Sequence, residues 1–288
     1  MNIYRKKYPI FITFILFTTY LILDNLLDGD WTKLENSYEN LSVFFHESLW
    51  PPNWKVIEAQ SYPECETYDF LCSPAYIGIS TTIKIAFVST CLGFMISLPI
   101  AVISSRNLNN DLVAIPFRYL LAAMRTLPSI LWALLFVITT GLGALSGVLG
   151  LTFYTVGYLG KLQYEAIEGV SSETLDAARA MGLKKTEIVQ RVVIPETGNN
   201  LISQLLFMFE YNVRHGSIIG IVGAGGLGYY IPTYLKYYHY DKVMALLIIL
   251  FFVVVFIDLL SMKARSYFID DATFKSPSLF GNFFREKK

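Results

Sequence analysis

Charge is scarce in this 288-residue sequence: Asp, Glu, Lys and Arg make up 16% of it, whereas 54% is hydrophobic. A soluble domain usually carries about a quarter charged residues, so this chain has too few to cover a water-facing surface. Its 23 basic and 23 acidic residues cancel, which leaves no electrostatic argument for a nucleic-acid partner. The sequence therefore predicts a protein of the lipid bilayer.

Residues that form metal sites and disulfides are few as well. The three histidines are scattered and form no metal pattern, and three cysteines are too few for a disulfide scaffold. Cys65 and Cys72 lie in one segment at a spacing that leaves two alternatives, a small disulfide loop or two free thiols. The sequence holds no cluster of catalytic His, Asp or Cys and no Walker A motif. We therefore expect no catalytic residue, no metal, no cofactor and no ATP hydrolysis by this chain.

Long apolar runs predict an all-α, polytopic membrane protein with about six transmembrane helices. The hydrocarbon core takes roughly 20 apolar residues of helix, and each span satisfies its own backbone hydrogen bonds. The predicted spans are 9–27, 76–103, 116–140, 145–164, 201–222 and 243–262.

Basic residues orient these spans, because Lys and Arg favour cytoplasmic loops. They lie before the first span, between the second and third, between the fourth and fifth, and after the sixth, whereas the acidic segment 28–74 falls on the opposite side. Both termini are therefore expected in the cytoplasm. No small-residue cleavage site follows the first apolar run, so we interpret it as a retained helix instead of a signal peptide.

The loop between the fourth and fifth predicted spans has an ordered pattern. Ser171 or Ser172 can cap a first short helix, and Gly182 is a natural left-handed stop. Thr186 begins a second short helix that we expect to end before Pro195. Leu175, Ala178 and Met181 are expected to share one face of the first helix. The pattern predicts a compact cytoplasmic hairpin within about residues 165–200; an ordinary surface hairpin is the alternative.

This loop resembles the EAA loop of permease subunits of bacterial ABC importers. The likeness rests on an acidic residue followed by two alanines, a glycine and a final Ile-Pro at the family spacing, with Asp replacing the usual Glu. It implies a type I ABC importer permease, with a core at 76–262 between an N-terminal helix and outer segment (1–75) and a cytoplasmic tail (263–288). It also implies a coupling helix that docks on the ATPase through Asp176, Ala177, Ala178, Gly182, Ile194 and Pro195.

The resemblance also implies partners and a solute class. The partners are an ATPase dimer, a second copy of the chain and an extracytoplasmic solute-binding protein, in the bacterial cytoplasmic membrane. The stretches 118–136 and 210–228 are similar to phosphonate importer permeases, which implies phosphonate, phosphite or a related phosphorus oxyanion. Methionine-type permeases share part of the glycine run, so another small solute such as methionine is an alternative. A stand-alone secondary transporter would need its own ion-coupling site and often has inverted repeats, and neither is evident.

A glycine-rich run imitates a nucleotide-binding motif. Gly223, Gly225 and Gly228 match the dinucleotide pattern, but no amphipathic helix with an acidic residue about 20 positions on follows. We expect Gly223, Gly225, Gly226 and Gly228 to allow close backbone packing, or a bend that serves gating. Pro128 is expected to kink the third span and to serve the same purpose.

Charged residues within the predicted spans need a partner or water, because each costs at least about 2.5–3.5 kcal/mol at the centre of a helix in lipid. Arg118 is expected to extend toward the cytoplasmic interface. Glu210 and Arg214 are four residues apart, so they share a helix face and can neutralise each other. The alternative is a pore-lining role, in which Arg125 or Arg214 lowers the barrier for an oxyanion.

Overall fold

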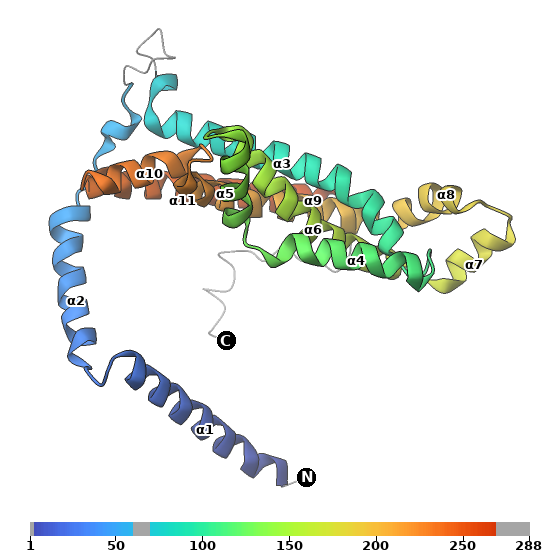
Figure 1. Ribbon diagram of the computed structural model, residues 1–288, viewed down its shortest axis with the longest axis horizontal. Coiled ribbons are helices and arrows are strands. Elements are labelled where there is room, and N and C mark those ends of the chain that lie inside the picture. The colour runs from blue at the N-terminus through green and yellow to red at the C-terminus, as the bar shows by residue number, and fades with distance from the viewer. Residues whose placement is uncertain (1–2, 60–69, 269–288) are drawn as a thin grey trace, which may run out of the picture. The chain divides into compact units, whose positions relative to one another are not determined.

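The computed structural model describes residues 3–59 and 70–268, and helices are the only regular secondary structure in these ranges (Figure 1). The chain divides between residues 52 and 53 into two compact units. The predicted functional boundary at residue 75 stays a prediction.

The smaller unit contains α1 (Ile3–Leu26), α2 (Thr32–Phe44) and the short π-helical turn η1 (Phe45–Leu49). Polar and aromatic contacts fix the corner between α1 and α2. The Trp31 indole Nε1 donates to Asp24 Oδ1 at 2.8 Å, and the Trp31 ring stacks on Tyr20 with centroids 5.4 Å apart. The corner therefore has a defined geometry within this unit.

The larger unit is a helical bundle with two short 3-10 turns before it. Its elements are η2 (Trp54–Ile57), η3 (Phe70–Cys72), α3 (Pro74–Ser104), α4 (Asp111–Thr126), α5 (Ser129–Thr140), α6 (Ala144–Glu168), α7 (Ser172–Ala180), α8 (Lys185–Ile188), η4 (Val189–Val193), α9 (Ile194–Ile219), η5 (Gly220–Val222), α10 (Leu227–Lys236) and α11 (Tyr240–Phe268). Within this unit α7 and α8 lie at one end and α10 at the other (Figure 1).

Small residues hold the bundle helices close together. A Cβ on Gly150 of α6 would lie 2.6 Å from the Ala133 backbone in α5, and one on Gly157 would lie 2.8 Å from the Leu121 carbonyl oxygen in α4. On the α3 side, a Cβ on Gly93 would collide with Thr155 of α6. Such contacts let helix backbones approach closely without a large apolar interface.

Every predicted span contains a helix, but the described helices differ in length and straightness. By length and apolar character, α3 and α11 alone could each cross a membrane. Two bent pairs raise that number to four if each pair is one span: α4 with α5, bent by 86°, and residues 185–222 with α10, bent by 45°. α6 does not meet the same criterion, and Phe11–Leu26, the apolar part of α1 whose side chains the structure describes, is shorter than these spans. The count of six crossings therefore stays a prediction.

Pro128 breaks the predicted third span instead of kinking it. Leu127 and Pro128 both have extended backbone conformations, with ψ of 135° and 147°. A residue before proline is driven out of the helical region by its contact with the proline ring, so α4 ends at Thr126. The Trp132 Nε1 donates to the Met124 carbonyl oxygen at 2.9 Å and ties α5 back to α4.

Candidate coupling site and charge cluster

The predicted hairpin is present between α6 and α9. Ser171 caps α7, because its Oγ accepts from the Thr174 backbone N–H at 3.2 Å. At the apex Gly182 has φ +77°, a conformation that costs glycine little. The Glu187 carboxylate accepts from the Lys184 backbone N–H at 2.8 Å and so caps α8. Capping at both helix starts and a left-handed apex explain why this sequence folds locally into a hairpin.

Two details of the hairpin differ from the sequence expectation. The second helix does not end before Pro195, because α8, the π-helical turn η4 and α9 run on without a gap. Pro195 lies in the first turn of α9, directly after the π-helical turn η4, so the continuous helix accommodates a residue without an N–H next to a locally widened turn. Met181 is 71% exposed, because α7 ends at Ala180 and the chain turns away before Met181 can join the buried face.

The hairpin has its own apolar core. Leu175 and Ala178 of α7 pack with Ile188 and Val193 of the second helix, and this group continues into Ile167 of α6. Ala177 and Asp176 are exposed on the other side of α7. One face thus fixes the hairpin to the bundle, while the other is available to a partner.

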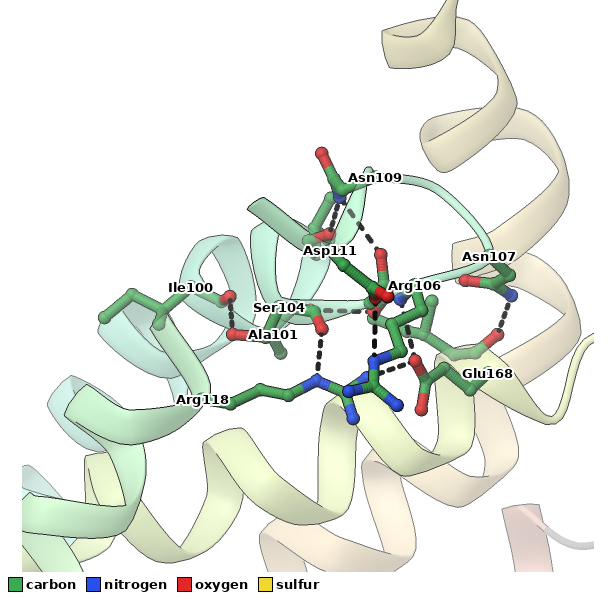
Figure 2. A network of polar contacts seen from close by, with 12 residues as sticks. Ile100, Ala101, Ser104, Arg106, Asn107, Asn109, Asp111, Arg118 and Glu168 are labelled. Atoms are coloured by element: carbon green, nitrogen blue, oxygen red, sulfur yellow. Dashed lines mark hydrogen bonds and ion pairs between the residues drawn. The ribbon is translucent and has the colours of Figure 1, made fainter. Parts of the chain in front are cut away.

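Arg118 is bound inside the protein, contrary to the expectation that it extends toward the interface. Its guanidinium pairs with Glu168, and its Nε donates to the Ser104 carbonyl oxygen at 2.8 Å (Figure 2). It also lies 4.4 Å from the centre of the Tyr164 ring. Glu168, at the end of α6, supplies a nearby anion, so Arg118 does not need to extend into water.

A charge cluster lies between α9 and α11. The predicted Glu210–Arg214 pair is present, with the Glu210 side chain 8% exposed and that of Arg214 52% exposed. Arg265 of α11 adds a contact that the sequence did not predict, with its Nη2 3.5 Å from Glu210 Oε2. No ion pair joins Arg125 to either residue among the described side chains; Arg125 lies half-buried at the end of α4.

Beside this cluster, aromatic rings from α6 and α9 form a continuous stack, which we call the aromatic wall. Tyr211 stacks on His215 with centroids 3.8 Å apart and on Tyr154 and Tyr158 at 5.8 and 6.0 Å. The Tyr154 and Tyr211 hydroxyls are 2.9 Å apart and share a hydrogen bond. Sequence reasoning missed this wall, although Tyr154 and Tyr158 on α6, and Tyr211 and His215 on α9, each have helical i, i+4 spacing.

The glycine run packs tightly at the other end of the unit. Gly223, Gly225 and Gly226 all have φ between +73° and +86°, which excludes most side chains. A Cβ on Gly226 would lie 2.5 Å from the Thr82 Oγ1 of α3, and that oxygen accepts from the Leu227 backbone N–H at 2.9 Å. A Cβ on Gly228 would collide with the Ser217 carbonyl oxygen. The arrangement therefore favours the close-packing interpretation of this run.

The predicted disulfide alternative concerns Cys65, which lies outside the described residues. It stays a prediction.

Sequence comparison gives the family. Residues 79–266 match the model of the binding-protein-dependent transport system inner membrane component family. The chain belongs to this family. The matched range runs from α3 to α11 and includes the hairpin, the charge cluster and the aromatic wall.

Individual relatives agree with the family assignment. The permease is 29% identical to the putative phosphite transport system permease protein HtxC of Stutzerimonas stutzeri, over 88% of this chain and 87% of that protein. It is 33% identical to the phosphite transport system permease protein PtxC of the same organism, over 65% and 68% of the two chains. It shares its fold with a chain of the inward-facing MetNI methionine ABC transporter, with a TM-score of 0.59 and 23% sequence identity. The match covers 66% of this chain and 94% of the MetNI chain. The chain is thus a multi-pass membrane permease with the fold of a type I ABC importer permease.

Proposed function

We propose that this permease forms the passage of an ATP-driven importer for phosphite, phosphonate or a related phosphorus oxyanion. The names of its phosphite-transport relatives support the solute class. In the proposed assembly two copies of the chain surround one passage, an ATPase dimer binds from the cytoplasm, and a solute-binding protein delivers solute outside. ATP is hydrolysed on the partner subunits. Both termini of the permease lie in the cytoplasm, on the same side of the membrane as the ATPase.

The hairpin is the proposed contact with the ATPase. Asp176, Ala177, Gly182 and Met181 lie on its exposed side, and the exposed Ala177 and Ala180 keep α7 narrow enough to enter a groove. Ala178, which was expected to dock as well, is 1% exposed in the core of the hairpin and is not part of the proposed contact. ATP binding would close the ATPase dimer and displace the two hairpins. The permease then contributes different packing in its inward-open and outward-open states, because a ligand shifts an equilibrium only by binding the two states unequally.

The aromatic wall and Arg214 are the proposed lining of the passage. Positions 207, 211, 214, 215 and 218 fall within about 100° of arc on α9, because each residue advances about 100° around a helix. This face combines a half-exposed guanidinium with tyrosine hydroxyls and an imidazole, all of which can donate to an oxyanion. Lipid is an unfavourable neighbour for such a face, whereas a hydrated passage is a suitable one. The half-exposed Arg214, held by the buried Glu210, is the observation that carries the proposed solute class.

The test measures solute uptake into liposomes that carry the complete complex of permease, ATPase and binding protein. Wild type should take up phosphite or methylphosphonate only with ATP inside. Arg214→Ala should still fold, because Arg265 continues to neutralise Glu210. It should raise the KM for solute about tenfold or more, the scale of one lost hydrogen bond to a charged group.

Matched variants separate a lining role from a structural one. Arg214→Lys retains the cation and should recover part of the affinity. Lys263→Ala removes an exposed cation of α11 that lies beyond the predicted sixth span and should change nothing. Gradient-driven uptake by the permease alone would contradict the importer assignment. ATP-driven uptake of methionine without phosphite or phosphonate uptake would contradict the solute class.

A further inference from the structure

The turn between α3 and α4, residues 105–110, is held in a defined shape. The Asn109 backbone N–H donates to the Ser105 carbonyl oxygen at 3.0 Å, and its side-chain Nδ2 donates to the Val102 carbonyl oxygen at 2.7 Å. Figure 2 shows the polar side chains of this turn, with Arg118 of α4 and Glu168 of α6 directed toward it. We call it the α3–α4 turn.

Both helices of the hairpin reach this turn. From α7, the Arg179 Nη2 donates to the Asn107 carbonyl oxygen at 2.7 Å. From α8, the Lys185 ammonium donates to the Asn109 side-chain oxygen. Leu108 of the turn packs against the apolar core of the hairpin. The hairpin therefore holds the turn through two separate cationic contacts and one apolar contact.

Asp176 also acts through this contact. Its carboxylate pairs with the Arg179 Nη1 at 2.8 Å, while Nη2 of the same guanidinium is directed to the turn. Asp176, the acidic residue of the loop motif, thus forms an ion pair with Arg179 of the same chain and orients its guanidinium toward the turn. A side-chain contact of the loop with its own bundle was not evident from the sequence.

On its other side the turn is joined to α4 and α6 through Glu168. One carboxylate oxygen, Oε1, accepts from the Arg106 backbone N–H at 2.7 Å and also from Arg118 of α4. The Asn107 Nδ2 donates to the Ile167 carbonyl oxygen at 2.8 Å. Arg118 and Glu168 are only 20% and 27% exposed, so solvent screens this pair less than an ordinary surface ion pair.

We propose that the α3–α4 turn is a transmission joint, which carries displacement of the hairpin into α4 and so to the break at Pro128. Arg179, Glu168 and Arg118 are positioning residues of this joint. The inference rests on the proposed coupling of the hairpin to an ATPase. Because α4 begins directly after the turn, a hairpin that moves with the turn also moves the start of α4. A joint fixed by hydrogen bonds transmits displacement, whereas a loose loop would absorb it.

The test measures coupling in the complete reconstituted complex. For Arg179→Ala and Glu168→Gln, the solute moved per ATP hydrolysed should fall about tenfold, the scale of losing a hydrogen bond to a charged group. ATP hydrolysis itself and co-purification of the ATPase should be retained. Arg179→Lys should recover part of the coupling, and Lys263→Ala, which removes an exposed cation of α11, should behave as wild type.

A cross-link separates a moving joint from a merely structural contact. In the double variant Asn107→Cys with Arg179→Cys, a short bifunctional thiol reagent replaces the lost hydrogen bond with a covalent link. The unlinked variant should be uncoupled, and linking should restore uptake per ATP, with reagent-treated wild type as the control. Loss of uptake on linking that a reductant reverses would overturn the joint, because the hairpin would then have to slide past the turn.

The two proposals fail in different ways. Normal ATP-driven uptake by wild type, together with unchanged coupling in Arg179→Ala and Glu168→Gln, would overturn the joint and leave the proposed function intact. A wild-type complex that takes up methionine but neither phosphite nor methylphosphonate would overturn the proposed function instead, and the joint would stand if Arg179→Ala and Glu168→Gln lower the methionine moved per ATP hydrolysed.

Discussion

Glycine ends a helix at both ends of the larger unit, but for different physical reasons. At the apex of the hairpin, Gly182 has φ +77° and an added Cβ would meet nothing within 4 Å. In the glycine run, Gly220 has an ordinary helical φ of −63°, yet an added Cβ would lie 2.5 Å from the Gly225 carbonyl oxygen and from the Gly228 Cα. Gly182 is therefore needed for its backbone conformation, whereas Gly220, just before the glycine run, is needed because no space is left for a side chain.

The largest expected effect is steric and lies in the glycine run. Gly220→Val places a branched side chain against backbone atoms that cannot move without displacing α10. Overpacking of this kind costs about 3 kcal/mol or more when the neighbours are rigid. The melting temperature of the purified permease in detergent should fall sharply. An unchanged melting temperature would show that α10 yields easily and that the two regions do not differ in packing.

A smaller effect is expected from the polar contact in the same region. Thr82→Val keeps the shape of the side chain but leaves the Leu227 backbone N–H without its acceptor. A buried donor without a partner costs about 1–3 kcal/mol. Thr82→Ser should retain most of the stability because the acceptor remains. Equal melting temperatures for the Val and Ser variants would contradict a role for this hydrogen bond.

Substitution at the hairpin apex should cost less stability but more coupling. Gly182→Ala forces a Cβ into the left-handed region, at about 1 kcal/mol, and Gly182→Asn should cost less because Asn tolerates that conformation. Gly182→Val should abolish ATP-driven uptake while the protein remains in the membrane, since a branched residue strongly disfavours positive φ. Uptake at the wild-type level by the Val variant would contradict the coupling role.

The smallest effect should have the opposite sign. Gly198 lies in α9 with helical φ, and an added Cβ meets nothing within 4 Å. Gly198→Ala should therefore stabilise the permease by about 0.5–1 kcal/mol, because alanine loses less backbone entropy in a helix. Destabilisation at this open position would show that glycine substitutions in this protein cannot be judged from local space and φ.

Local features of the fold could be predicted from the sequence. Apolar runs of sufficient length predicted α3 and α11, and the spacing of four residues predicted the ion pair between Glu210 and Arg214. A serine cap and a glycine stop predicted the first helix of the hairpin, and Thr186 marked the start of the second to within one residue. Each depends on residues within a few turns of one helix, where periodicity determines which side chains meet.

Contacts between distant segments could not be predicted. Arg118 and Glu168 are 50 residues apart, and Glu210 and Arg265 are 55 apart, so their pairing depends on the register of packed helices. The continuation of α8 into α9 across Pro195 was missed because a proline in a first turn and a proline after a helix look alike in sequence. The sharp bend before α5 was underestimated for a similar reason, since proline can either kink or end a helix.

The right angle between α4 and α5 has a consequence for the surrounding bilayer. A helix that stops leaves its last four carbonyl groups without helical partners. Among the side chains that the structure describes, Thr126 and Trp132 donate to two of them, those of Ala123 and Met124, at 2.7 and 2.9 Å. Hydrocarbon cannot solvate the remaining carbonyls, which makes an oily environment costly there. Irregular backbone at membrane depth is tolerated where protein covers it or where it lines a water-filled cavity, so we expect the break, with Arg125 beside it, to face the passage or a neighbouring helix and not lipid tails.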